Sequence, residues 1–353
     1  IAVTRILQAQ SQVTIARSQE SPTVDGSASA PYAGYTGSDR PIPLPDNSFA
    51  PQAGLGVAWE LDFWGRFRRN TEAAQAELLA SEDARFVVMA TLVAEVGKAY
   101  LTLRALDLTL EISRRTVTSR MQSLDLVRAR LEGGVAGILD LRQAETLLYS
   151  ATKTIPEIQR QIEQTENFIN ILLGQNPGPV KRGRPLEAQI AAPTLPPGLP
   201  SDLLARRPDI RRAEQQLVAA NAQIGVATAL LYPQTTISGF AGAGGATIDG
   251  SSFGPYGIFS VLPTITLPIF NAGRLQANVE YNDARAQEAV LRYRQTLQQA
   301  FREVADALVD IRKRQEFRQQ QELLVRALAD ASQVASLRYE GGVSSYLEVL
   351  DTE

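Results

Sequence analysis

The chain has neither cysteine nor histidine. The lack of cysteine excludes disulfides, thiol catalysis and zinc–thiolate sites, and the lack of histidine excludes imidazole acid–base chemistry. Acidic residues are plentiful, but no pattern groups them into a catalytic set. The glycine-rich run 242–245 has no following lysine and no phosphate-loop context. We therefore expect a protein that is not an enzyme and that uses no cofactor and no metal.

Charge and long apolar runs are also scarce. The formal net charge is -3 and 21% of the residues are charged, so the sequence offers no basic field for nucleic acid. No apolar run approaches the roughly 18 residues that a membrane-spanning helix needs, which argues against a helical membrane protein but not against the alternating strands of a β-barrel. The sequence opens at Ile1 without a start Met and stops at Glu353 inside an apolar-periodic run, so we expect a piece lacking both termini.

The sequence repeats itself at a spacing of about 208 residues. The run Glu132-Gly133-Gly134-Val135 falls on Glu340-Gly341-Gly342-Val343 without a gap, and Gly65-Arg66 falls on Gly273-Arg274 in the same register. Chance similarity between helices of biased composition would give scattered alanine and leucine matches, but not this shared glycine turn. We therefore interpret the chain as an internal duplication.

Each half follows one plan: two strands with a turn-rich loop between them (36–48 and 245–255), then a very long helix, a Gly-Gly turn and a return helix. Apolar residues alternate from Ala53 to Phe63, which predicts a strand. Apolar residues recur every seven positions from Met89 to Leu110, which predicts coiled-coil packing. With no proline or paired glycine in 65–131, that helix would be about 100 Å long at about 1.5 Å per residue.

These patterns give the expected boundaries. The first repeat, 1–187, holds the end of a helix, strands at about 22–35 and 51–63, a long helix at about 65–131 and a return helix at about 137–174. A Pro-rich crossover, 174–205, follows. The second repeat, 206–353, holds a helix at about 208–231, strands at about 233–246 and 256–270, a long helix at about 273–339 and a return helix from about 344.

Four strands per chain are too few to close a barrel, because the smallest single-chain barrels have about eight. An open sheet edge in a membrane would leave backbone groups unpaired, so transmembrane strands would have to be pooled from several chains. Three chains would supply twelve strands and a second tube of long helices. The pattern alone is equally compatible with a small soluble sheet that caps a helical bundle.

Several motifs carry a family resemblance that covers essentially the whole chain. They are the run LARRPDIRRAEQQLVAANAQIG at 204–225, the Tyr232-Pro233 step, the strand-to-helix junctions at 59–66 and 268–274, and the turn at 338–343 with its continuation to Asp351. These runs resemble the signature of the outer-membrane efflux proteins, relatives of TolC. The most similar group is the NodT/OprM-type lipoproteins of tripartite RND efflux systems.

The resemblance implies an α+β membrane protein in which three copies form a twelve-strand β-barrel that continues into a twelve-helix periplasmic α-barrel. The expected location is the outer membrane of a Gram-negative bacterium, with a lipid anchor on an N-terminal Cys absent from this sequence. The expected function is the exit duct of a tripartite efflux pump, which passively conducts drugs or other small toxic molecules. The expected partners are two further copies of the chain, outer-membrane lipid, a periplasmic adaptor (membrane fusion protein) and, through the adaptor, an inner-membrane RND pump.

A duct does no chemistry, so the expected sites are a gate and a docking surface. By the resemblance, Leu347 and Asp351 lie at an apolar and an acidic ring of the periplasmic end, and Tyr339 pins the closed tip to a neighbour. Leu347 and Asp351 are four residues apart and share a helix face. Three carboxylates at an axis would attract cations, and an apolar ring can gate by dewetting. Without the resemblance, the pattern favours coiled-coil core for Leu347, a solvated face for Asp351 and ordinary packing for Tyr339.

The Gly-Gly turns are the expected docking surface, because small residues let a partner backbone approach closely. The alternative is that the glycines only end the helices. Only the second tip carries the Asp351 match, with Gln143 at the corresponding position of the first. The docking residues are Gly134, Val135, Ala136, Gly342, Val343 and Ser344. The aromatic residues expected at the membrane boundary, for which packing at strand ends is the alternative, are Tyr32, Tyr35, Trp59, Trp64, Tyr256 and Phe259.

Two other functions remain open. The same architecture would also serve as the exit duct of a type I protein secretion system. A soluble coiled-coil adaptor or scaffold would explain the heptads, but it explains neither the paired alternating strands nor the two turn-rich loops.

Overall fold

The computed structural model describes residues 1–34, 47–189, 206–344, 348–349 and 352. The chain divides into two compact units, Ile1–Val87 with Leu199–Phe301 and Val88–Gly198 with Arg302–Glu353. Each long helix contributes one part to each unit. The first unit holds the sheet, and the second holds both Gly-Gly turns.

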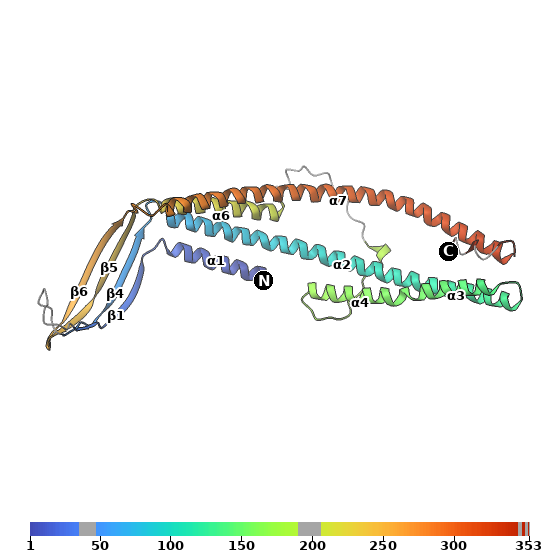
Figure 1. The fold of residues 1–353 in the computed structure, drawn as a ribbon, viewed down its shortest axis with the longest axis horizontal. Helices are drawn as coiled ribbons and strands as arrows, with labels where there is room; N and C mark the ends of the chain where they lie inside the picture. The colour runs from blue at the N-terminus through green and yellow to red at the C-terminus, as the bar shows by residue number, and fades with distance from the viewer. Residues whose placement is uncertain (35–46, 190–205, 345–347, 350–351, 353) are drawn as a thin grey trace. The chain divides into compact units, whose positions relative to one another are not determined.

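The first unit contains one antiparallel sheet whose main strands follow the order β1-β4-β5-β6, as the ribbon in Figure 1 shows. A short β2·β3 pair continues the sheet beyond β1 and β4, because β3 also pairs with β5. The strands are β1 (Thr23–Ser29), β2 (Tyr32–Gly34), β3 (Asn47–Phe49), β4 (Gln52–Leu61), β5 (Gln234–Ile248) and β6 (Ser251–Thr266).

Prolines lie at both strand breaks of the first half. The expected strand at 22–35 is divided into β1 and β2, whereas the expected strand at 51–63 is β4 alone, and β3 forms at the end of the expected loop. Pro31 separates β1 from β2, and Pro51 separates β3 from β4. Proline has no N–H to donate to a ladder, so each strand loses its pairing locally and resumes beyond the break. The backbone N–H of Ala50 donates to the Pro31 carbonyl across the gap at 3.0 Å.

The expected loop at 245–255 is wrong, because most of it is strand. β5 and β6 extend into a tight hairpin whose last pair is Ile248 with Ser251. The two residues between them, Asp249 and Gly250, have φ of 47° and 84°. Asp-Gly is the pair that this kind of two-residue turn prefers, because both positions need positive φ.

The two faces of the sheet differ in polarity. Cross-strand partners share a face, and one face carries the row Val24, Val57, Gly239 and Val261. The next row of that face is Gly26, Leu55, Ala241 and Phe259. The opposite face is mixed and carries the polar residues Asp25, Ser27, Glu60, Thr236, Ser238 and Thr264 together with Phe240, Ile258 and Leu262. Leu55, Val57, Phe259 and Val261 are all exposed, so the apolar face of the sheet is uncovered in the single chain.

Two helices of 67 residues leave the sheet, α2 (Arg66–Glu132) after β4 and α7 (Arg274–Glu340) after β6. Two shorter helices, α1 (Ala2–Ser18) and α6 (Pro208–Ala229), lead into β1 and β5. Pro208 occupies the first turn of α6, and the Arg207 guanidinium pairs with Asp209 at 2.6 Å. Pro is favoured there because the first N–H groups of a helix have no intrahelical partner.

Among the described helices, α2 contains a window of mean hydropathy 1.5 that is long and apolar enough to cross a membrane by length and composition. The window is 11% buried. Phe86, Met89 and Val93, three of its heptad residues, are exposed in the single chain.

In the second unit the return segment of the first half forms two helices, α3 (Ile138–Thr152) and α4 (Thr154–Leu172), rather than the single expected one. Pro156 explains the break at Lys153, because its ring clashes with the carbonyl four residues earlier and it donates no hydrogen bond. Ile158, Ile162 and Ile169 of α4 pack on Ala99 and Leu103 of α2. The heptad interface is therefore formed within the chain along this part of α2.

Salt bridges anchor the described start of the Pro-rich crossover. The Arg182 guanidinium makes two hydrogen bonds of 3.1 Å to the Asp107 carboxylate and also contacts Glu166. Asp107 additionally pairs with Arg104 at 2.7 Å. The backbone N–H of Gly183 donates to the Tyr100 hydroxyl at 2.7 Å. A short 3-10 turn, η1 (Leu186–Ala188), follows, and 190–205 lie outside the described residues.

Candidate functional site

The two Gly-Gly turns have the same backbone geometry. At the end of α2, the Val135 N–H donates to the Arg130 carbonyl at 2.9 Å and the Gly134 N–H to the Leu131 carbonyl at 3.0 Å. At the end of α7, Val343 and Gly342 make the matching bonds to Arg338 and Tyr339 at 2.9 and 3.0 Å. Gly134 and Gly342 both have φ of 73°. This is the Schellman motif, whose left-handed position glycine fills without steric cost.

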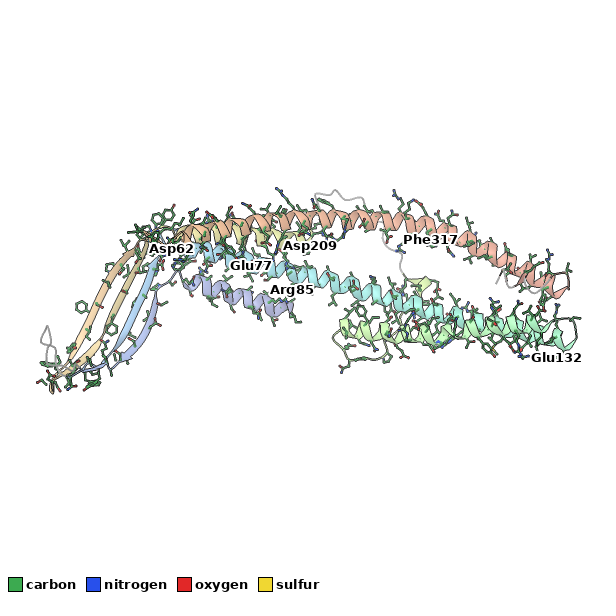
Figure 2. The ribbon with its side chains drawn as sticks, viewed as in Figure 1. Asp62, Glu77, Arg85, Glu132, Asp209 and Phe317 are labelled. Atoms are coloured by element: carbon green, nitrogen blue, oxygen red, sulfur yellow. The ribbon has the colours of Figure 1, made fainter. Side chains whose placement is uncertain are left out.

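The predicted docking residues lie at these turns and are largely open to solvent. Val135 is 79% exposed and Val343 is 74% exposed. Nothing lies within 4 Å of the place that a Cβ on Gly134 or Gly342 would occupy. Ala136 and Ser344 are half-buried, and within the described part of the chain the buried hydroxyl of Ser344 has no hydrogen-bond partner. Each turn therefore presents one exposed apolar side chain beside open backbone. Glu132, the residue before the first turn, is labelled in Figure 2.

The two tips differ just beyond the turns. In the first, the Asp140 carboxylate accepts a hydrogen bond from the Gly137 N–H at 3.0 Å and so caps α3. In the second, Glu348 stands at the corresponding position and lies 3.7 Å from the Arg338 guanidinium. Both partners of that pair are half-exposed, so its contribution to stability is small.

Tyr339 is buried within its own chain, with an exposed fraction of 7%. Its neighbours in the core are Leu124 and Val127 of α2, Ala144 of α3 and Val349. The Arg130 guanidinium lies 4.2 Å from the centre of the Tyr339 ring. Arg130 also donates to the carbonyls of Tyr339 and Glu340 at 2.9 and 3.0 Å. Residues of α2 thus hold the last turn of α7 through a cation–π contact and two charge-assisted hydrogen bonds.

Sequence reasoning missed Arg130, whose only signal was its correspondence to Arg338 under the repeat. The two arginines have different partners. Arg130 contacts the other half of the chain, whereas Arg338 forms an ion pair with Glu348 of its own half. The two gate residues, Leu347 and Asp351, lie outside the described residues, although Val349 between them belongs to the core around Tyr339.

The predicted aromatic residues occupy several environments. Trp64 stacks on Tyr232 with 4.6 Å between the ring centres and donates to the Pro233 carbonyl at 2.7 Å. Trp59 donates to the Glu20 carbonyl at 3.2 Å. Tyr32 donates to the Asn47 side chain at 2.6 Å, at the far end of the sheet. Tyr256 and Phe259 on β6 are exposed, and Tyr35 lies outside the described residues. Both tryptophans therefore fix the junction between strands and helices.

The two strongest pKa shifts at the crossover and at α6 come from ion pairs that stabilise the structure. No cluster of three potential metal ligands occurs among the described residues. Hydrogen bonds to Asp107 and Glu166 raise the pKa of Arg182, and burial opposes that rise. A hydrogen bond from Arg207 lowers the pKa of Asp209 below its ordinary value. Both pKa shifts favour the charged form, of Arg182 at the crossover and of Asp209 at the start of α6.

Comparison with known proteins gives consistent matches over nearly the whole chain. The family model described as outer membrane efflux protein matches residues 2–175 and 199–353. The solvent efflux pump outer membrane protein SrpC of Pseudomonas putida is 37% identical over 342 residues, which cover 96% of this chain and 72% of that protein. The cation efflux system protein CusC of Escherichia coli O6:H1 is 33% identical over 356 residues, which cover 100% of this chain and 76% of that protein.

A solved structure agrees with the sequence relatives. The outer-membrane channel OprN matches with a TM-score of 0.91 and 32% identity, covering 99% of this chain and 79% of that chain. The fold described above is therefore similar to that of a channel of known structure. The chain belongs to the outer membrane efflux protein family and is an outer-membrane channel of a tripartite efflux system.

Proposed function

We propose that three copies of this chain form one exit duct, in which the sheets close a twelve-strand barrel and the helices continue it into the periplasm. The uncovered apolar face of the sheet carries this proposal. A soluble protein rarely leaves a contiguous apolar face of this kind open to water, whereas a barrel presents it to lipid. The opposite face, with the polar residues Asp25, Glu60 and Thr236, would line the water-filled interior.

The second tip is the proposed gate. Leu347 and Asp351 would ring the axis there, and Arg130 would hold the end of α7 in its closed position through Tyr339. The support is the contact between α2 and α7 at the tip, which would have to break if the last turn of α7 moved away from α2. At the first tip, among the described residues, the Asp140 carboxylate caps α3 within its own half of the chain.

The two turns are the proposed docking points for hairpins of a periplasmic adaptor, through which the duct would connect to an inner-membrane RND pump. Two exposed valines in identical backbone settings, each next to a bare glycine, offer two equivalent contacts per chain. Six such contacts per trimer would suit a ring of adaptor hairpins. A lipid anchor on a preceding Cys is part of the same proposal.

Small organic solutes are the proposed cargo. The relative SrpC is described as a solvent efflux protein. Soft metal ions prefer thiolate, thioether and imidazole ligands, and this chain has no Cys, no His and two Met. The wall of a duct formed by this chain would therefore offer soft metal ions few side chains that bind them.

The test is conductance of the full-length protein in planar bilayers. Asp351→Ala should raise the closed-state single-channel conductance, because the acidic ring is removed. An unchanged closed-state conductance would count against the gate. Recovery of the protein as a soluble monomer, rather than in the outer-membrane fraction, would contradict the duct itself.

A further inference from the structure

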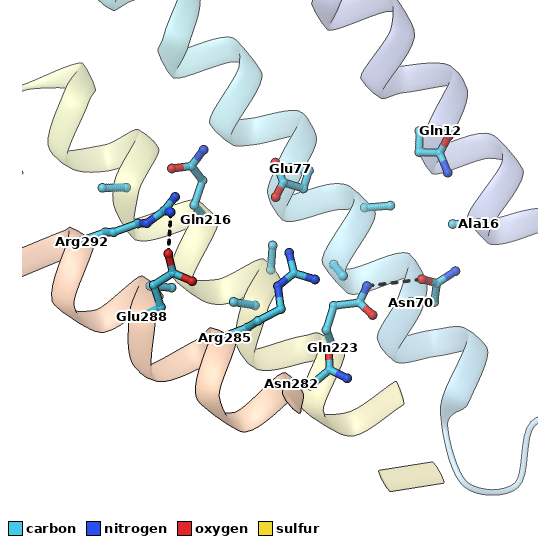
Figure 3. A pocket seen from close by; sticks show the side chains of 16 residues that line it. Gln12, Ala16, Asn70, Glu77, Gln216, Gln223, Asn282, Arg285, Glu288 and Arg292 are labelled. Carbon is cyan, nitrogen blue, oxygen red and sulfur yellow. Dashed lines mark hydrogen bonds and ion pairs between the residues drawn. The ribbon is translucent and has the colours of Figure 1, made fainter. Parts of the chain in front are cut away.

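A cavity of about 410 Å³ lies in the helical layer of the first unit and takes no part in the sites described above. Residues of α1, α2, α6 and α7 line it, and Figure 3 shows their side chains. Its volume is within the range of about 300–1,000 Å³ that is usual for small-molecule sites. The cavity is therefore large enough to hold a small organic solute.

The cavity lies on the side of the helical layer that continues the mixed face of the sheet. Glu60 is on that face of the sheet, and its carboxylate pairs with the Arg66 guanidinium at 2.6 Å. Asn70, Ala73 and Glu77 follow Arg66 at intervals of three or four residues, so they share its helix face. All three line the cavity. In the proposed duct this side faces the water-filled interior, so a solute in transit would pass the cavity.

The lining combines small apolar side chains with hydrogen-bonding groups and four charges. Seven of its sixteen residues are alanine and five carry a side-chain amide. Glu288 and Arg292 neutralise each other in an ion pair. Within the described part of the chain, neither Glu77 nor Arg285 forms an ion pair, and the Arg285 guanidinium lies 5.8 Å from the centre of the Tyr281 ring. One anion and one cation of the wall therefore lack a counter-ion.

These two charges occupy equivalent positions of the duplicated plan. Glu77 and Arg285 each lie eleven residues after the first residue of their long helix, Arg66 or Arg274. Eleven residues make about three helical turns, so each side chain returns to the face of that first residue at the same level of its helix. Figure 3 shows the Arg285 side chain extending from α7 toward the α2 side of the cavity. The two halves of the chain thus place opposite charges at one level of the wall.

We infer that this cavity binds zwitterionic organic solutes, which carry both a carboxylate and an ammonium group. The carboxylate would pair with the planar guanidinium of Arg285, which can donate two parallel hydrogen bonds. The ammonium group would donate to the Glu77 carboxylate, and the carbon chain between them would lie on the alanines. A singly charged solute would satisfy only one of the two side chains. This inference rests on the proposed function, because it names a class of cargo that the wall of the duct would hold.

The expected binding is weak, because Glu77 and Arg285 are both exposed to solvent. An exposed ion pair changes an equilibrium by at most about fivefold. A zwitterion should therefore bind about fivefold more tightly than a singly charged analogue and about 25-fold more tightly than an uncharged one. A site of this strength can take up a solute and release it again, as conduction requires.

A titration of the full-length protein in detergent, followed by NMR of the ligand, tests the assignment. The probe is ε-aminocaproate, with caproate and hexylamine as its singly charged analogues. Glu77→Gln should remove the preference for ε-aminocaproate over caproate, and Arg285→Gln should remove its preference over hexylamine. Glu288→Gln/Arg292→Gln is the matched control, because it removes a neutral pair from the same wall and should leave both preferences unchanged.

A charge reversal separates ligand binding from a structural role. Glu77→Arg places two cations on the wall, so this variant should bind the dicarboxylate adipate more tightly than ε-aminocaproate, whereas the wild type should show the opposite order. A change in fold alone would not invert the order of two ligands of equal length.

The outcomes distinguish the cavity from the duct. Equal affinity of the wild type for ε-aminocaproate, caproate and hexylamine would overturn the inference, and so would preferences that persist in both Glu77→Gln and Arg285→Gln. If the protein forms channels in planar bilayers but shows no preference for the zwitterion, the binding site alone is refuted. If it forms no channels, the proposed duct is contradicted, whatever the cavity binds.

Discussion

Replacing Arg130 should loosen the second tip. Arg130→Met keeps the length of the side chain but removes two hydrogen bonds of 2.9 and 3.0 Å and a ring contact at 4.2 Å. Hydrogen bonds to a charged donor contribute about 1.5–3 kcal/mol when buried, and we take about 1 kcal/mol each here because Arg130 is only half-buried. The cation–π contact adds about 0.5 kcal/mol. The total of about 2.5 kcal/mol corresponds to a change of roughly 70-fold in the local opening equilibrium.

Two measurements check this value. Hydrogen exchange of the amides in 335–344 should accelerate by a similar factor, and the fraction of time that single channels spend open should rise. Arg338→Met is the matched control, because Arg338 is the equivalent residue but its ion pair, to Glu348, is long and half-exposed. Equal effects of the two substitutions, or no effect of either, would refute the assignment of Arg130 as the residue that holds α7.

Three further predictions concern other contacts. Arg182→Met should weaken the anchoring of 178–183 by about 2 kcal/mol, since it removes an ion-pair partner of Asp107 and Glu166. Hydrogen exchange of the Gly183 amide measures this loss. Protection of that amide equal to the wild type would contradict the prediction. Gly342→Ala should lower the free energy of unfolding by about 1–2 kcal/mol, because φ at this position is 73°. Gly178→Ala is the control, because Gly178 has no positive φ and nothing lies within 4 Å of the added Cβ. Equal changes in the denaturant midpoint of the two variants would argue against backbone strain at Gly342. The pKa of Asp209 in the folded state is lowered from 3.8. Its ion pair with Arg207 therefore stabilises the start of α6 above pH 3.8, and this stabilisation is lost as the pH falls below 3.8. Asp209→Asn should flatten the acid dependence of amide hydrogen exchange in 208–212, and an unaltered pH profile would exclude the ion pair as its cause.

The sequence predicts local structure best where a residue type favours one backbone conformation. Paired glycines after a long heptad run could only end a helix, so both tip turns were predictable. Pro156 and the Asp249-Gly250 pair are equally specific for a helix break and a hairpin turn, but the helical pattern around Pro156 and the turn residues around Asp249 obscure them. Arg130 was not predictable, because its partners are backbone carbonyls more than 200 residues away and sequence periodicity does not report such contacts. The exposed heptad residues of α2 and α7 would pack between chains in the proposed oligomer, which the sequence of one chain does not describe.

The equal length of α2 and α7 limits how the molecule can change. One inserted residue turns everything beyond it by about 100° around the helix axis, so it would redirect a whole coiled-coil seam. A change in one helix alone would also shift one Gly-Gly turn relative to its counterpart. We therefore expect natural length variation in this protein to occur in both helices together and in steps of seven residues. The distance spanned between two membranes would then be adjustable only in units of about 10 Å.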